Sequence, residues 1–396
     1  MQADPEARSQ RLESSPSDPT VRFLTLACCA TLVTALACGT AAGQTFDFNG
    51  RASGWLGASW DTSFLGQAGL RYLPEARFSA PVGGQFTFDA EASVNGFVSA
   101  NARTFDRPEV EARLKPYRGF VRVSSPQFEA RAGLQKVNFG SAMLLRPLMW
   151  FDRVDPRDPL ELTDGVYGLL ARYCFQNNAN VWAWGLIGNS SPKGWETIGT
   201  DDRWKPEFGG RAQLPVPRGE VAATYHHRSV HREEPGIVTR FNEDRVGLDG
   251  RWDVGVGVSV EATMQRQGFA GQEIWQRAAV LGLDYTLGIG NGLGVVVEHL
   301  YLGGSSSAFG KAIGGDAHVS SLLLSYPVGI LDNLRAITLY DWRNKGVCSF
   351  VGWQRTLDSW LFSATAFWNP DTPVSLGAPG GGAAGKGVQL MVVFNH

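Results

Sequence analysis

After its first forty or so residues, this 396-residue chain has no run of about 18 apolar residues, the length that a membrane-spanning helix requires. A helical membrane protein is therefore excluded. An excess of positive charge is also missing, because 36 Lys and Arg stand against 38 Asp and Glu, for a net charge of -2. Nucleic-acid binding needs a basic surface, so nucleic acid is not an expected partner.

Cysteine is scarce, and of the 5 cysteines only Cys174 and Cys348 lie outside the N-terminal region. No CxxC or Cys/His spacing suggests a metal site and no motif calls for a cofactor, so we expect neither. An oxidising compartment would permit a disulfide between the two cysteines. In the strand order given below, however, they lie near opposite ends of their strands. Roughly 25 Å of apolar band then separates them, so we expect no bond.

The N-terminal region has the pattern of an export signal. Residues 23–37 (FLTLACCATLVTALA) are apolar but short for a membrane span, and they follow Arg22 and precede a run of small residues. We expect cleavage after Gly43. The chain then divides into an N-terminal extension with a signal peptide, 1–43, and a single domain, 44–396.

Two details of this region leave alternatives open. The polar segment 1–20 is unusual in front of a signal, and one interpretation is that translation begins at the position of Val21. The other alternative makes Cys38 a lipidated cysteine, although the usual Leu three residues upstream is missing.

What the remaining three quarters of the chain does contain is alternation of apolar and polar residues in segments of about ten residues. In 245–253, one face would carry Val246, Leu248 and Trp252 and the other Arg245, Asp249, Arg251 and Asp253. The period recurs in 128–135 and 221–228. One face suits lipid and the other suits water. A soluble sandwich needs only a few such strands, whereas a closed antiparallel transmembrane β-barrel needs many.

The strands number eighteen, an even count, as a single-chain bacterial barrel requires. We expect them at 47–59, 65–79, 85–101, 116–124, 127–138, 165–175, 179–188, 206–214, 219–230, 241–253, 255–266, 275–287, 292–303, 316–326, 332–343, 346–356, 359–368 and 387–395. Most of the links alternate between short turns and long loops, as periplasmic and external links do. Long external loops are expected at 101–115, 139–164, 189–205, 231–240, 267–274, 304–315 and 369–386. Sixteen strands is the alternative if 346–368 is wrongly divided.

The link from Phe139 to Gly165 is the most distinctive stretch. It interleaves charged side chains with large apolar ones: Arg146, Asp152, Arg153, Asp155, Arg157, Asp158, Glu161 and Asp164 with Leu144, Leu145, Leu148, Met149, Trp150 and Phe151. A loop in open solvent would leave those apolar residues as a sticky patch. We expect them to pack against the inner barrel wall while the charges face the channel. The alternative is an ordinary external loop with a small hydrophobic cluster.

This stretch resembles the inward-folding third external loop of porins, and like that loop it follows the fifth strand. In plan, the mature chain is similar to porin-like outer-membrane proteins and alginate-export-type barrels. The last strand, 388–394 with Phe394, resembles the C-terminal signal that outer-membrane barrels present for insertion, although Asn395 and His396 follow it. The resemblance implies a bacterial outer-membrane location, with outer-membrane lipid and the barrel-assembly machinery as partners. The oligomeric state stays open between a monomer and a homo-trimer.

By the same alternation, the luminal wall carries both signs of charge. The basic residues expected there are Arg118, Arg122, Arg131, Arg172, Arg211, Arg245 and Arg251, and the acidic ones are Asp89, Glu91, Glu129, Glu207, Asp249, Glu261 and Asp284. Mixed signs favour a paired network over a filter of one sign. We expect the acidic residues of the long link to pair with Arg118, Arg122 or Arg131, which with Arg172 would line the constriction.

An enzyme is a second class to weigh. His226, His227 and His231 cluster near the outer end of the expected strand 219–230, but adjacent residues of a strand face opposite sides, and no GxSxG elbow is present. We expect these histidines to fill the wall. The sequence thus predicts a non-enzymatic channel for passive or substrate-selective diffusion of small hydrophilic solutes. The alternatives are a barrel enzyme and a plugged structural or adhesive barrel.

Overall fold

The computed structural model describes residues 43–60, 63–103, 108–152, 154, 158–190, 193, 200–201, 203–234, 237–269, 272–311, 315–369 and 385–396. Its strands are β1 (Thr45–Trp60), β2 (Phe64–Gly83), β3 (Phe86–Arg103), β4 (Glu109–Ser124), β5 (Phe128–Gln135), β6 (Val166–Cys174), β7 (Asn180–Leu186), β8 (Thr200–Asp201), β9 (Glu207–Val216), β10 (Gly219–Glu234), β11 (Ile237–Asp253), β12 (Gly257–Phe269), β13 (Gln272–Leu287), β14 (Leu293–Ser305), β15 (Ala317–Val328), β16 (Asp332–Asp341), β17 (Gly346–Leu357), β18 (Trp360–Asn369) and β19 (Gly385–Asn395). Among the described residues no helix is long and apolar enough to cross a membrane.

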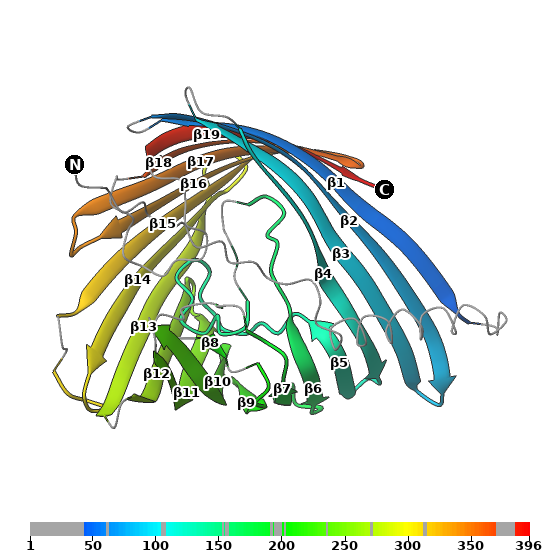
Figure 1. Ribbon diagram of the computed structural model, residues 1–396, viewed down its shortest axis with the longest axis vertical. Coiled ribbons are helices and arrows are strands. Elements are labelled where there is room, and N and C mark those ends of the chain that lie inside the picture. The colour runs from blue at the N-terminus through cyan, green and yellow to red at the C-terminus, as the bar shows by residue number, and fades with distance from the viewer. Residues whose placement is uncertain are drawn as a thin grey trace, which may run out of the picture. The chain divides into compact units, whose positions relative to one another are not determined.

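The sheet closes on itself (Figure 1). Each long strand pairs antiparallel with the next one, and β19 pairs with β1 from Arg51↔Asn395 to Trp60↔Lys386. The two-residue β8 adds only a short pairing with β10, while β7 pairs directly with β9. Apart from β8, the described residues therefore form a barrel of eighteen strands, which confirms the expected number and excludes sixteen.

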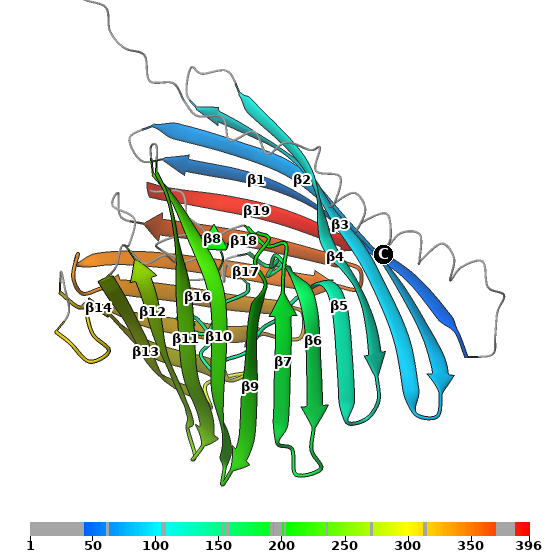
Figure 2. The ribbon, with the colours of Figure 1, turned by 60° about the horizontal axis from the view of Figure 1, so that its bottom comes forward.

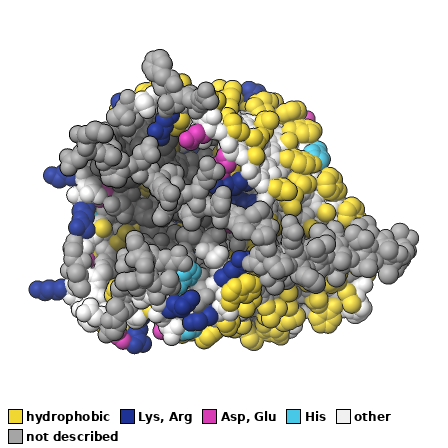
Figure 3. Space-filling view, in the orientation of Figure 1, with side chains coloured by type: hydrophobic (Ala, Val, Ile, Leu, Met, Phe, Trp, Pro, Cys, Tyr) yellow, Lys and Arg dark blue, Asp and Glu magenta, His cyan; other side chains and the backbone are white. Residues whose placement is uncertain are grey.

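Side chains alternate between the outside and the lumen as expected. On β11, Val246 and Leu248 are 49% and 57% exposed on the outside, whereas Arg245, next to Val246 in the sequence, is 2% exposed. Figure 3 shows hydrophobic side chains gathered on the outer surface of the barrel. An apolar exterior around polar inward residues is the arrangement that lipid requires.

Three links expected to be long loops are mostly strand. Strand β4 begins already at Glu109, β10 and β11 form one long hairpin with only 235–236 outside the described strands, and β12 and β13 are separated by 270–271 alone. The polar residues that looked like loop remain paired, as Arg266 is with Glu273 across β12 and β13. Polar composition marks where the lipid ends, and hydrogen-bonded strands can continue beyond that point.

The two cysteines are placed as expected. Cys174 is free and exposed at the end of β6, beside the short turn to β7. Cys348 lies on β17, packed in a buried cluster with Val296 and Phe350. The thiols are therefore not bonded to each other.

The last two residues extend the barrel seam. His396 and Gly50 exchange two backbone hydrogen bonds of 3.0 Å, so the ladder between β19 and β1 runs to the chain end. The His396 ring stacks on Tyr72 with a centroid separation of 5.9 Å and lies 6.0 Å from the ring of Phe394. The imidazole thus joins an aromatic group beside the residue that the insertion signal usually places last.

Candidate functional site: a lumen divided by one loop

The link between β5 and β6 lies inside the ring of strands (Figure 2). Its first anchor is a buried cluster in which Val137, Phe139, Leu148, Trp150 and Phe151 pack against four inward residues of β6 and β7: Val166, Leu170, Trp184 and Leu186. Every member is at most 7% exposed. Because this cluster excludes water, it closes the lumen on the β6–β7 side.

The second anchor lies across the lumen. Ala142 and Leu145 pack with three buried residues of β13–β15: Val280, Leu300 and Val319. Leu144 packs against the same cluster and against the neighbouring one that contains Ile337 of β16. The apolar residues of the loop therefore do pack against the inner wall, and the alternative of an ordinary external loop is wrong.

Two wall carboxylates hold the backbone of this loop. Glu298 of β14 accepts hydrogen bonds from the amides of Met143, Leu144 and Leu145 at 2.6, 3.0 and 2.7 Å. Glu261 of β12 accepts from the amides of Ala142 and Leu148 at 2.7 and 3.1 Å. Both carboxylates are 0% exposed. Five amide donors thus satisfy the oxygens of two buried carboxyl groups, which would otherwise be costly to bury.

Sequence reasoning placed Glu261 in the lumen but did not single out Glu298. The signal that could have found it is a carboxylate at an inward position of an otherwise apolar segment, 295–302 (VVVEHLYL). A buried acid with no basic neighbour in the pattern needs donors from elsewhere, and a loop backbone supplies them.

Two glycines make the close approach of loop and wall feasible. Gly140 has φ +107°, in the region that favours glycine, and an added Cβ would overlap Glu261 Oε1. Gly247 of β11 lies under the loop, where an added Cβ would overlap Leu148 Cδ2.

We expect Gly140→Ala to weaken docking of the loop by about 1–3 kcal/mol, because the substitution adds backbone strain and a clash with the carboxylate. Thermal unfolding in detergent should show a lower midpoint, and limited proteolysis should cut the loop faster. Gly57→Ala is the control, since its Cβ would meet neighbours only at 3.6 Å, an ordinary contact. Equal behaviour of the two variants would show that Gly140 does not set the docking.

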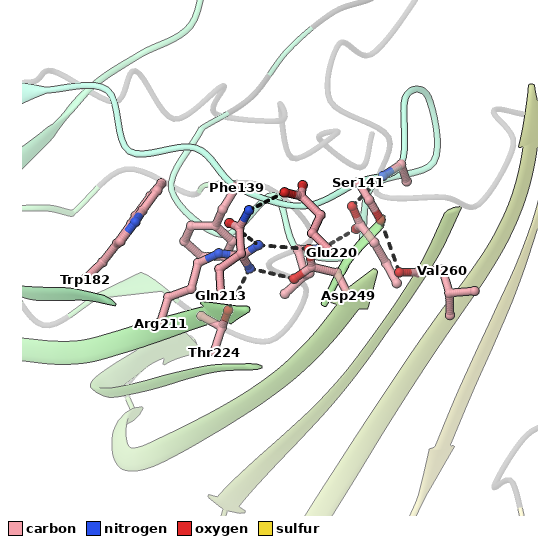
Figure 4. Close-up of polar contacts among 12 residues, drawn as sticks. Phe139, Ser141, Trp182, Arg211, Gln213, Glu220, Thr224, Asp249 and Val260 are labelled. Atoms are coloured by element: carbon pink, nitrogen blue, oxygen red, sulfur yellow. Dashed lines mark hydrogen bonds and ion pairs between the residues drawn. The ribbon is translucent and has the colours of Figure 1, made fainter. Parts of the chain in front are cut away.

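Next to Phe139 of the first anchor, charged side chains of β9–β11 form a network of ion pairs and hydrogen bonds (Figure 4). Arg211 donates to both oxygens of Asp249 at 2.5 and 2.9 Å and to Thr224 Oγ1 at 3.0 Å, and its guanidinium lies 5.3 Å from the ring centroid of Phe139. The hydroxyl of Ser141 donates to the Val260 carbonyl at 3.1 Å. The loop is therefore seated on a paired, nearly neutral wall.

A second buried network lies beside it. Glu243, at 0% exposure, accepts from Arg228 at 2.6 Å and from Arg245 at 2.5 Å, and Gln267 also donates to it. Mixed signs thus form pairs, as expected for the wall.

The histidines also behave as wall residues. His226 is 1% exposed, with Nδ1 accepting from the Trp184 indole at 3.2 Å and Nε2 lying 3.2 Å from Glu207. His227 faces the other side, with Nδ1 2.8 Å from Asp244. Both ring nitrogens of His226 are thus engaged in polar contacts with neighbouring wall side chains. Among the described residues, no group of three or more His, Cys, Asp or Glu could hold a metal ion.

The wall arginines expected at the constriction are paired differently from the prediction. Arg122 donates to Asp89 at 2.9 Å, Arg131 donates to Glu129 at 3.0 Å, and Arg172 lies 3.7 Å from Glu129. Arg118 donates to the carbonyl and hydroxyl of Thr163, both at 3.0 Å. Among the described residues, no hydrogen bond or ion pair joins Arg118, Arg122 or Arg131 to Asp152 or Asp158, and Arg122 and Arg131 pair with acids of the strands. The predicted pairing with Asp155 lies outside the described residues and stays a prediction.

The charged residues of the loop separate into three groups. Arg146 bonds within the loop, donating to Asn138 and to the Phe139 carbonyl. Arg153, Asp155 and Arg157 lie outside the described residues. The remaining acids are Asp152, Asp158, Glu161 and Asp164.

Asp152 is buried instead of facing an open channel. Its side chain is 2% exposed, and within the described residues neither carboxylate oxygen has a hydrogen-bond partner. Burial raises the pKa of Asp152, while the nearby charges of Arg146 and Lys136 oppose that shift. The Phe139–Phe151 cluster draws the neighbouring Asp152 inward, an effect that alternation cannot predict for a loop.

A raised pKa means that the folded protein holds this proton to higher pH than the unfolded chain does, so Asp152 lowers stability as pH rises through its folded pKa. We therefore expect Asp152→Asn to raise the thermal midpoint at neutral pH and to reduce the gain in stability on mild acidification. Asp164→Asn is the matched control, because Asp164 is exposed and its pair with Lys115 is worth little. A lower midpoint for Asp152→Asn at pH 7 would refute the assignment.

The three other acids approach bases on different strands. Asp164 lies 2.5 Å from Lys115 of β4, Glu161 lies 3.8 Å from Arg335 of β16, and Asp158 is within electrostatic range of Arg71 of β2. Glu161 and Asp164 are 61% and 68% exposed. The exposed charges of the loop thus face the part of the lumen bounded by β2–β4 and β16, away from the water-free clusters.

Comparison with known proteins places this arrangement. No family model matches the chain, and neither does any curated protein. Among solved structures, Acinetobacter baumannii OccAB4 is 8% identical with a TM-score of 0.54, over 89% of this chain and 98% of that one. Pseudomonas aeruginosa OccK5 is 12% identical with a TM-score of 0.53, over 90% and 99%. An anion-selective porin from Comamonas acidovorans is 12% identical with a TM-score of 0.50, over 89% and 100%.

Because the sequence identities are so low, these matches show a similar fold and nothing more. The described residues form a closed, eighteen-stranded antiparallel barrel, and its fold is similar to that of a solved porin. The expected resemblance is confirmed at this level.

Proposed function

We propose that this protein is a channel of the bacterial outer membrane through which small hydrophilic solutes diffuse, passively or with selection by the docked loop. The observation that carries the proposal is the division of the lumen. Part of it is filled by the two water-free clusters, and another part retains exposed charges such as those of Glu161, Asp164 and Arg335. Exposed charge inside a barrel requires water, and a water-filled path of this kind conducts ions and solutes.

The remaining elements of the proposal concern partners. Outer-membrane lipid would cover the apolar exterior. The barrel-assembly machinery would recognise β19, which carries Phe394 close to its end. A monomer and a homo-trimer both fit the barrel. A plugged structural barrel is the second candidate, because the docked loop already fills much of the lumen.

Liposome swelling tests the proposal against its alternatives. Liposomes that contain the refolded barrel should swell in small polyols and sugars at rates that fall with solute size. A plugged scaffold or a membrane-bound enzyme would give no swelling above protein-free liposomes, and that result would contradict the proposal.

A further inference from the structure

A narrow cleft lies between Pro159 of the loop and the inner wall of β16–β18. Two rows of directly opposed residues form its floor, Asn333–Gln354–Ser363 and Arg335–Gly352–Thr365. Opposed residues of antiparallel strands point to the same face, so both rows face Pro159 together. In the part of the chain that the structure describes, no charged pair network of the kind seen on β9–β11 covers this floor.

We propose that this cleft is a binding subsite for a neutral, hydroxyl-rich solute, such as a sugar ring, on its way through the barrel. The inference deepens the channel proposed above and rests on it. Amide and hydroxyl side chains both donate and accept hydrogen bonds, as the hydroxyl groups of a sugar do. Among the described residues, the side chains of Gln354, Ser363 and Thr365 have no protein hydrogen-bond partner, so these groups are available to a solute.

The charge of the cleft favours a neutral solute. Arg335 is the one cation among the described residues that line the cleft, and it lies 3.8 Å from Glu161 Oε1, so the loop supplies a compensating acid. An anionic solute would have to compete with Glu161 for Arg335 and would lose hydration without gaining an unpaired cation. An arginine–carboxylate pair beside neutral amides can instead bind neighbouring hydroxyl groups, the cation as donor and the acid as acceptor.

The cleft is narrow, and what it offers to a ring at its mouth is the spacing of the groups on its floor. Gly352 leaves a recess in the middle of the floor, where an added Cβ would come no closer than 3.6 Å to Thr365 Oγ1 and 3.9 Å to the Ala364 carbonyl. Neighbouring strands lie about 4.8 Å apart, so polar groups of one row are spaced by about the breadth of a pyranose ring. Pro159 and Phe350 supply apolar surfaces against which the C–H face of a sugar can pack.

Isothermal titration calorimetry on the full chain, refolded in detergent, tests the inference with D-glucose and sodium D-glucuronate, which differ in one carboxylate. Glucose should bind more tightly than glucuronate. Gln354→Leu should weaken glucose binding about fivefold, the effect of losing one neutral hydrogen bond. Gln67→Leu, an exchange of the same chemistry on β2 outside the cleft, should leave binding unchanged.

Tighter binding of glucuronate, or equal loss in the two variants, would overturn the subsite. A barrel that conducts ions but binds no glucose overturns the subsite and leaves the channel standing. A silent barrel that binds glucose and loses that binding in Gln354→Leu overturns the channel and retains the cleft as a sugar site.

Discussion

Replacing residues 141–151 by a short Gly-Ser linker should raise the single-channel conductance several-fold. These residues carry the loop side chains that fill the lumen, among them Leu145, Leu148 and Trp150, and the amides bound by Glu261 and Glu298. Without them, the space between β6–β7 and β13–β15 becomes water-filled and the open cross-section grows. The strand ladder should persist, because every strand is paired on both sides independently of the loop. Heat-modifiable migration on gels would verify that the barrel has folded.

The control for this deletion is a variant that also removes residues, but at a place away from the loop. Shortening the tip of the β10–β11 hairpin removes residues from the ends of two paired strands and should leave conductance within the spread of the unaltered protein. A folded loop-deletion barrel with unchanged conductance would mean that the loop does not occupy the conducting path.

Glu298→Ala should release one end of the loop without unfolding the barrel. The substitution leaves three amides, those of Met143, Leu144 and Leu145, without an acceptor, at a cost of about 1–3 kcal/mol for each one that stays buried. Undocking lets water satisfy these amides. We therefore expect conductance that fluctuates between the parental level and higher levels, and faster proteolysis within 141–151.

The series around this variant makes the test quantitative. Glu298→Gln retains one acceptor oxygen and should have an intermediate effect. Glu261→Ala leaves two amide donors without an acceptor, against three for Glu298→Ala, and should have a smaller effect. Glu220→Ala serves as the control, because Glu220 bonds to Gln213 on the wall. Steady parental conductance in Glu298→Ala would refute the role of the carboxylate as a clamp.

The fold could be predicted because the strands of a barrel alternate between lipid-facing and lumen-facing residues, and this alternation is visible in the sequence. Alternation fixed which residues face lipid, as Val246 and Arg245 illustrate, and the order of links gave eighteen strands. The lengths of β4, β10 and β11 could not be predicted in the same way. Beyond the lipid, both faces of a strand are polar, and the alternation that marks the strand is lost there.

The candidate site was predictable only in part. Large apolar residues in the loop indicated docking, and mixed charges on the wall indicated pairing. The partners of individual charges were not predictable, because the donors to Glu298 are backbone amides, which have no signature in the sequence. The burial of Asp152 was not predictable for a related reason. The direction of its side chain depends on how Trp150 and Phe151 pack, and a loop has no regular period from which that direction could be read.

The most direct test of the account is the single-channel current of the refolded protein in a planar lipid bilayer. A barrel whose lumen is only partly filled by its loop should give discrete, long-lived conductance steps in potassium chloride, and their size should increase on deletion of 141–151. A bilayer that stays silent with the intact protein and also with the deletion variant, both shown to be folded, would contradict a conducting lumen.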